Sequence, residues 1–201
     1  MGTLYVVRHG QTDWNAEGRL QGASDIPLNA HGREQARRNG QALRAHLTDA
    51  TALSYTASPL QRASETLAIV RRELGLEANA FERDARLMEA RFGQWEGRLM
   101  RDIAIEDPDA WQAARGDRWN TIPPGAEGTT ESLRMLATRV EGFLEETFHG
   151  STGDRLIATH GGVMRVIRVL FGETPAERIG TLETPQDRVM AVRDGTTISW
   201  I

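Results

Sequence analysis

Two short runs of β-forming residues, far apart in the chain, each end at a histidine followed by glycine. The first run, residues 3–8, breaks at His9-Gly10, and a later one, residues 156–158, ends at Thr159-His160-Gly161-Gly162. Strands that alternate with helices are typical of α/β domains, in which ligands bind outside the carboxyl ends of the strands. We therefore expect both histidines to face one pocket, where the glycines let a ligand approach the backbone.

The rest of the chain alternates in the same way. Apolar residues at helical spacing predict helices over 130–148, 163–171 and 30–47, the last capped by Asn29. Ser58-Pro59 predicts the start of another helix, which runs to about Leu74. Further strands are expected over 52–57 and 81–88, and 189–192 with 196–200 form a closing hairpin around Asp194-Gly195. The segment 97–128, which contains several prolines, is expected to be irregular.

Composition excludes several kinds of chemistry. No cysteine is present among the 201 residues, which excludes disulfides, thiolate metal sites and cysteine nucleophiles. All 24 basic residues are arginine, so there is no lysine for a phosphate loop or a Schiff base. A net charge of −4 gives no reason to expect nucleic acid or an anionic membrane as a partner. The chemistry must therefore come from His, Arg, Asp, Glu, Ser or Thr.

The length favours one domain over residues 1–201, large enough to bury a core without disulfides. No apolar run reaches the roughly 18 residues that a transmembrane helix needs. The first residues show neither the basic head nor the apolar stretch of a signal peptide. We expect a cytoplasmic protein.

Four blocks of sequence resemble, in order, the signatures of one enzyme family. They are RHGQTDWN at 8–15, continued by GRLQG at 18–22, DIPL at 25–28 and GREQA at 32–36; SPLQRASET at 58–66; LME at 87–89 with FGQWEG at 92–97; and THGGV at 159–163. These blocks resemble the histidine phosphatase superfamily, the phosphoglycerate mutase-like proteins, and they cover most of the chain outside 98–129. The resemblance implies a three-layer α/β/α sandwich with a mostly parallel sheet and one antiparallel strand.

The resemblance implies a role for each catalytic position. His9 is the nucleophile that forms a phosphohistidine, and it must attack as neutral imidazole, which neighbouring guanidinium groups favour. Arg8 and Arg62 are the phosphate clamps, whose planar forks can each grip two oxygens. His160 hydrogen-bonds the transferring phosphoryl group. Glu89 is the proton donor, and it must be protonated when the alcohol leaves.

Further matches imply substrate contacts at Asn15, at the backbone around Gln21 and Gly22, and at Gly161. No metal or other cofactor is required, since arginines and histidines supply the positive charge. The expected partner is a small phosphorylated metabolite. A homodimer is a further possibility, because an edge strand or a helix can pair with a second copy without leaving a recognisable sequence motif. Thr130-Glu131-Ser132, where relatives show Gly-Glu-Ser, is interpreted as a helix cap.

The shared blocks do not separate phosphatases from mutases. A mutase must hold a second anionic group, yet residues 98–119 contain four arginines against five acids, which is no strong anion trap. We therefore favour a metal-independent phosphomonoester hydrolase, with phosphoglycerate mutase-type transfer as the alternative. A non-catalytic binding protein on the same fold is a further alternative. Residues 98–129 are expected to form a partial lid in which Trp111, Trp119 and the arginines of the segment choose the leaving group, unless both tryptophans belong to the core.

Overall fold

The computed structural model describes residues 2–150 and 152–201, and in this part of the chain a six-stranded sheet has the order β3-β2-β4-β1-β5-β6. The strands are β1 (Leu4–Arg8), β2 (Ser54–Ala57), β3 (Glu82–Arg83), β4 (Arg155–Thr159), β5 (Val189–Arg193) and β6 (Thr197–Trp200). The strands β1 to β4 are parallel, whereas β5 is antiparallel to both of its neighbours. The expected mostly parallel sheet with one antiparallel strand is confirmed.

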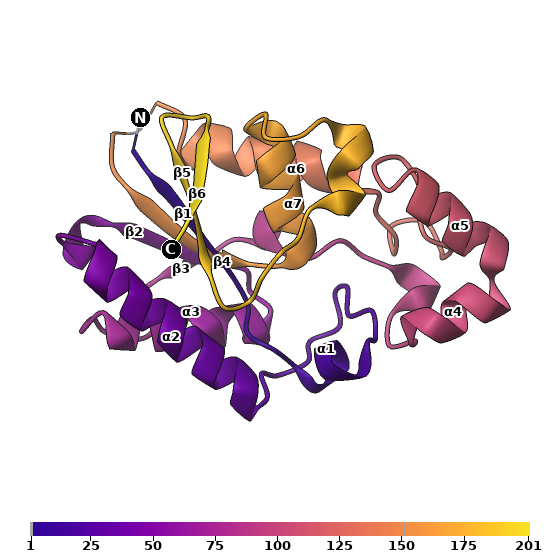
Figure 1. The fold of residues 1–201 in the computed structure, drawn as a ribbon, viewed down its shortest axis with the longest axis horizontal. Helices are drawn as coiled ribbons and strands as arrows, with labels where there is room; N and C mark the ends of the chain where they lie inside the picture. Colours follow the sequence, from indigo (N-terminus) through magenta and orange to yellow (C-terminus); the bar gives the residue numbers. More distant parts are fainter. Residues whose placement is uncertain (1, 151) are drawn as a thin grey trace.

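Helices cover both faces of this sheet (Figure 1). The pair α2 (Ala30–His46) and α3 (Gln61–Glu73) packs on one face, and the pair α6 (Leu133–Thr147) and α7 (Gly161–Leu170) packs on the other. Three shorter helices, α1 (Asp13–Glu17), α4 (Met100–Glu106) and α5 (Pro108–Gly116), lie on the side toward which β1 runs. The expected α/β/α sandwich is confirmed.

The alternation of side chains along β1 explains the two hydrophobic cores. Leu4 and Val6 point into one cluster with α6 and α7, whereas Tyr5 and Val7 point into the other with α2 and α3. A central strand that is covered on both faces must be apolar at every position, and the run of β-formers in 3–8 satisfies this requirement. The sheet is thus held rigidly between two layers, with its carboxyl-terminal edge left for function.

Two helix starts differ from the sequence prediction. The helix α3 begins at Gln61 rather than at Ser58-Pro59, and its first N–H donates to Asp25 Oδ1 at 2.7 Å. Ser58 is buried and its hydroxyl lies 2.8 Å from His160 Nε2, so it is engaged elsewhere. The helix predicted over 163–171 begins at Gly161, directly after His160.

The predicted strands 52–57 and 81–88 are shorter than expected. Residues Ala50–Ala52 form a 3-10 turn, which the side chain of Asp49 caps, and β2 starts only at Ser54. Likewise β3 ends at Arg83, and Ala85–Leu87 form a 3-10 turn capped by Asp84. In both places an aspartate accepts a backbone N–H two residues on, which favours a turn over an extended chain.

The segment 97–128 is not irregular throughout, because it contains α4 and α5. Pro108 stands at the first position of α5, where its missing N–H costs no hydrogen bond. The helix predicted over 130–148 begins at Leu133, with Ser132 accepting the N–H of Met135 at 3.2 Å, so the interpretation of 130–132 as a cap is confirmed. Further 3-10 turns span Gly93–Trp95 and Ala176–Thr181. No helix in residues 2–150 and 152–201 is long and apolar enough to cross a membrane.

Candidate active site

Strand pairing brings the two histidines together. Arg8 of β1 is in register with Thr159 of β4, so His9 and His160 leave adjacent parallel strands at the same edge. The N–H of His9 donates to the carbonyl of Thr159 at 2.9 Å, and the two imidazole ring centres are 5.1 Å apart. Both side chains are buried. The two histidines thus lie side by side as expected, although only His9 lines the cavity described below.

His9 is held in the form that a nucleophile requires. Its Nδ1 lies 2.8 Å from the carbonyl oxygen of Gly10. Burial, followed by the charges of Arg62 and Arg8, holds the pKa of His9 well below its usual value, so the imidazole is neutral at neutral pH. Because a carbonyl can only accept, Nδ1 carries the proton and Nε2 keeps its lone pair.

Arg8 and Arg62 are fixed by backbone carbonyls. Arg8 donates through Nη1 to the carbonyl of Thr184 at 2.6 Å, and Arg62 donates to the carbonyls of Ser24 at 2.6 Å and Gly22 at 2.8 Å. Burial lowers the pKa of Arg62 to about 10, which still leaves it charged at neutral pH. Neutral carbonyl partners orient these guanidinium groups without cancelling their charge.

Three buried nitrogens at this edge have no hydrogen-bond partner in the described structure: Arg8 Nε, Arg62 Nε and His160 Nδ1. The other ring nitrogen of His160, Nε2, is engaged with the Ser58 hydroxyl. An unpartnered buried donor costs on the order of 1–3 kcal/mol, and more where the group is charged. The arrangement can therefore accept an anion that supplies the missing acceptors.

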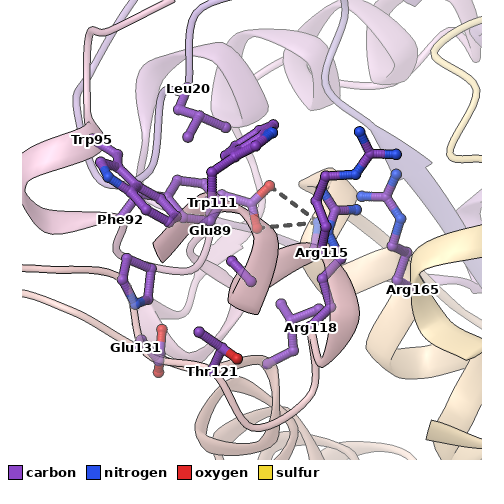
Figure 2. Close-up of a pocket in the computed structure, with 14 residues that line it drawn as sticks. Leu20, Glu89, Phe92, Trp95, Trp111, Arg115, Arg118, Thr121, Glu131 and Arg165 are labelled. Atoms are coloured by element: carbon purple, nitrogen blue, oxygen red, sulfur yellow. Dashed lines mark hydrogen bonds between the residues drawn. The ribbon is translucent and has the colours of Figure 1, made fainter. Parts of the chain in front are cut away.

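Glu89 lies at the amino end of α7. The N–H of Gly162 donates to both carboxyl oxygens of Glu89, at 3.1 Å each (Figure 2). A methyl group at Gly162 would meet Glu89 Oε1 at 2.2 Å, so only glycine lets the carboxyl group approach this closely. Gly162, in the fourth block of the sequence, thereby positions Glu89, which belongs to the third block.

Eight of the nine site residues predicted from sequence line one cavity of about 220 Å³: Arg8, His9, Asn15, Gln21, Gly22, Arg62, Glu89 and Gly161. The ninth, His160, is fully buried behind it, beside the ring of His9. The structure thus brings all nine residues together, although they come from strands, loops and helices spread over the whole chain.

Other residues of the site were missed from the sequence. Thr184 lines the cavity and holds Arg8, and Gln186 donates through Nε2 to the carbonyl of His9 at 3.0 Å and to Asn15 Oδ1 at 3.2 Å. Both lie in a loop without periodicity. Arg165 also lines the cavity, and its signal was visible, since it is one of only two charged residues in the apolar helix α7.

A second cavity of about 100 Å³ adjoins the first at Glu89 (Figure 2). Its wall contains Phe92, Trp95 and Trp111, and the two tryptophan rings meet edge to face with centres 5.9 Å apart. Trp119 is absent from this wall and packs instead against the core formed with α6 and α7. The two tryptophans of the expected lid therefore have different environments.

Comparison with known proteins identifies the family that the sequence motifs resemble. The family model described as histidine phosphatase superfamily (branch 1) matches residues 4–194. Phosphoglycerate mutase-like protein 4 of Arabidopsis thaliana is 34% identical over 164 residues, which cover 81% of this chain and 67% of that protein.

Two solved structures are similar over the whole chain. One is an Escherichia coli K-12 protein whose description proposes an alpha-ribazole-5'-P phosphatase; it is 28% identical, with a TM-score of 0.76, over 100% of this chain and 94% of that one. The other, a mycobacterial glucosyl-3-phosphoglycerate phosphatase, has a TM-score of 0.80 over 100% of this chain and 96% of that one, but at 24% identity it supports the fold alone. The chain belongs to the histidine phosphatase superfamily, whose members are phosphatases and phosphoglycerate mutase-like enzymes.

Proposed function

We propose that this protein hydrolyses a small phosphomonoester through a phosphohistidine intermediate on His9, without a metal ion. The observation that carries the proposal is the pairing of a neutral His9 with three unpartnered buried nitrogens around it. The nitrogens would stabilise the charge of a phosphoryl group while Nε2 attacks phosphorus.

In the first step, the lone pair of His9 Nε2 forms a bond to phosphorus and the ester P–O bond breaks. Glu89 gives its proton to the departing alkoxide oxygen, which leaves as an alcohol. Arg8 and Arg62 hold the phosphoryl oxygens throughout, and the Gly10 carbonyl keeps the Nδ1 proton in place. The product of this step is a phosphohistidine beside an ionised Glu89.

In the second step, water attacks the phosphohistidine. Glu89 takes a proton from the water as its oxygen bonds to phosphorus, and the P–N bond breaks, returning the electron pair to Nε2. Inorganic phosphate leaves, and both residues are restored. The position of Glu89 at the junction of the two cavities suits both roles, because it can reach the leaving group and the water that replaces it.

We also propose that residues 98–129 form a lid over the leaving group. Trp111 of α5 lines the second cavity, where its ring can cover an alcohol that leaves from the first. Since Trp119 packs against the core, we assign substrate choice to Trp111 and not to Trp119.

The test is phosphate release from a panel of phosphomonoesters with a chelator present, together with trapping of an acid-labile phosphoenzyme. We expect release from some esters, and we expect His9→Asn to abolish the trapped intermediate. His31→Asn, which changes an exposed histidine outside the site, should behave as the unmodified protein does. Glu89→Gln should slow turnover of esters with poor leaving groups by about 10²- to 10⁴-fold.

The runner-up is mutase-type transfer, which the name of the Arabidopsis relative favours. Movement of phosphate between two hydroxyl groups of one substrate, followed by phosphorus NMR, with little free phosphate would replace hydrolysis by transfer. Binding of esters without either reaction would indicate a non-catalytic member of the superfamily.

A further inference from the structure

Ser58 lies at the carboxyl end of β2, one residue beyond the strand. Its N–H donates to the carbonyl of Ala158 in β4 at 2.9 Å, which continues the parallel ladder in which Ala57 pairs with Ala158. Its own carbonyl accepts a hydrogen bond from the hydroxyl of Ser64 at 2.9 Å. These two backbone hydrogen bonds fix Ser58 at the edge of the sheet where His160 follows β4.

The side chain of Ser58 is fully buried, and its hydroxyl contacts an amide and an imidazole. The oxygen accepts the N–H of Leu60 at 3.3 Å and lies 2.8 Å from His160 Nε2. Among the hydrogen bonds of residues 2–150 and 152–201, the hydroxyl hydrogen has one acceptor, which is His160 Nε2. The hydroxyl therefore donates to the ring, because a buried O–H group without an acceptor is destabilising.

The direction of this hydrogen bond determines which ring nitrogen of His160 carries a proton. Burial, followed by the charge of Arg62, holds the pKa of His160 well below its usual value, so the neutral ring carries a single proton. Because Nε2 accepts from Ser58, that proton stands on Nδ1. In the opposite tautomer Nε2 would donate to Ser58, the hydroxyl would lose its acceptor, and Nδ1 would carry only a lone pair.

Nδ1 of His160 is one of the buried nitrogens that have no partner in the described structure. Since the ring centres of His160 and His9 are 5.1 Å apart, a phosphoryl group bonded to His9 Nε2 would lie beside His160. Ionised phosphoryl oxygens are strong hydrogen-bond acceptors. A protonated Nδ1 therefore stabilises the transferring group, whereas a lone pair at Nδ1 would repel it.

We propose that Ser58 is a positioning residue, whose hydroxyl donates to His160 Nε2 and keeps His160 in the tautomer in which Nδ1–H donates to the transferring phosphoryl group. The proposal rests on the proposed function, since it places that group beside His160. Ser58 is fully buried and lies outside the residues that line the cavity of about 220 Å³, so it acts through His160. No bond forms or breaks at Ser58, and no proton leaves it.

Nitrogen NMR of protein that is isotope-labelled at histidine tests the tautomer directly. The resonances of His160 are assigned by their absence in His160→Gln. At neutral pH we expect Nδ1 to have the chemical shift of a protonated ring nitrogen and Nε2 that of an unprotonated one. In Ser58→Ala this difference should shrink or reverse, because Nε2 loses its donor. A proton on Nε2 in the unmodified protein would overturn the proposal even if Ser58→Ala did not fold, and an unchanged tautomer in folded Ser58→Ala would also overturn it.

A double-mutant cycle tests whether Ser58 acts through His160. Ser58→Ala should lower kcat/KM for a phosphomonoester by about 10- to 100-fold, the usual effect of one hydrogen bond to a charged group. In a His160→Gln background the same substitution should have little further effect, because the residue through which Ser58 acts is gone. An equal loss in both backgrounds would contradict the proposal, since Ser58 would then act on the site independently of His160.

The matched control is Thr56→Val. Thr56 is buried and lies on the same strand as the residue before Ser58, but its hydroxyl accepts from Arg155 Nη1 at 2.8 Å. Loss of that hydroxyl should leave both kcat/KM and the ring shifts of His160 unchanged. A loss of kcat/KM as large as that of Ser58→Ala would show that any buried hydroxyl near this strand has the same effect, and the assignment to Ser58 would be wrong.

Binding of inorganic phosphate separates this proposal from the proposed hydrolysis. Calorimetry should show weaker binding of phosphate by Ser58→Ala than by the unmodified protein, because Nδ1–H of His160 no longer donates reliably. If no ester released phosphate while the ring shifts and the phosphate affinities followed this pattern, hydrolysis would be wrong and the role of Ser58 right. Release of phosphate by a protein in which His160 Nε2 carries the proton would leave hydrolysis standing and overturn the role of Ser58.

Discussion

At the scale of single residues, the candidate site places guanidinium groups that no acid neutralises next to a histidine that stays neutral. His9 is buried beside Arg8 and Arg62, whose hydrogen bonds go to backbone carbonyls rather than to acids. The imidazole therefore stays unprotonated, while the guanidinium groups stay free to bind an anion. The same buried histidines make the stability of the protein depend on pH.

We expect the free energy of unfolding to fall as the pH falls below about 6.5. Burial and the nearby arginines lower the pKa of His9 and of His160 in the folded state, so the unfolded chain binds protons that the folded chain does not. Above pH 6.5 neither state is protonated and these residues have no effect. Each contributes a slope of up to about 1.4 kcal/mol per pH unit.

Urea unfolding between pH 5 and 8 measures this slope. In His9→Asn the slope below pH 6.5 should be smaller than in the unmodified protein, because one of the two buried histidines is gone. The same slope in both proteins would show that His9 is protonated alike in the folded and unfolded states, and the neutral nucleophile would then be wrong.

At the scale of elements, the loop before α2 and the start of α3 form one unit around Arg62. Asp25 caps α3 from another part of the chain, while the carbonyls of Ser24 and Gly22 hold the Arg62 guanidinium. Gly22 has a φ of +53°, and a side chain there would meet Glu96 Oε1 at 2.1 Å. Helix capping and orientation of the phosphate clamp thus depend on the same loop.

Asp25→Ala should lower the free energy of unfolding by about 1 kcal/mol, the usual cost of losing a cap. It should also raise KM for phosphomonoesters, since the loop that orients Arg62 loses its attachment to α3. Urea unfolding and steady-state kinetics measure the two effects. Asp25→Asn keeps the accepting oxygen and should restore most of both, whereas a loss of stability without any change in KM would separate the cap from the clamp.

At the scale of the whole molecule, the sheet contributes to two hydrophobic cores, one on each of its faces. Phe143 lies in the core formed with α6 and α7, and Leu67 lies in the core formed with α2 and α3. Because β1 contributes alternate side chains to both, disruption of either core removes support from the strand that carries Arg8 and His9. We propose that residues 1–201 are one cooperative domain.

Phe143→Ala should cost about 3–5 kcal/mol and Leu67→Ala about 2–5 kcal/mol of unfolding free energy. In both variants, circular dichroism and tryptophan fluorescence should report a single transition at the same denaturant concentration. Two separate transitions in either variant would show that the layers unfold independently.

Much of the site could be predicted because its residues follow strand ends and lie within short motifs. The β-forming runs alone predict that His9 and His160 lie together, and the resemblance adds Arg8, Arg62 and Glu89. The helices α4 and α5 were not predicted, because the prolines of this segment favour irregular structure. Only the structure shows that Pro108 stands at the first position of α5, where a proline is compatible with a helix. The sequence predicts Ser58 as a helix cap, since nothing local indicates that His160 lies beside it.

The sequence by itself determined the alternating layers, since periodicity records which face of each element is buried, and its motifs indicated the residues that we propose as nucleophile and phosphate clamps. Packing between distant elements decided which charges remain unbalanced. Arg165 reaches the site from α7 and Arg118 reaches it from the turn after α5, while Asp117, the acid next to Arg118 in sequence, is exposed and accepts hydrogen bonds from Asn120. A charge acts through its distance in space to other charges, and that distance exists only once the chain is folded.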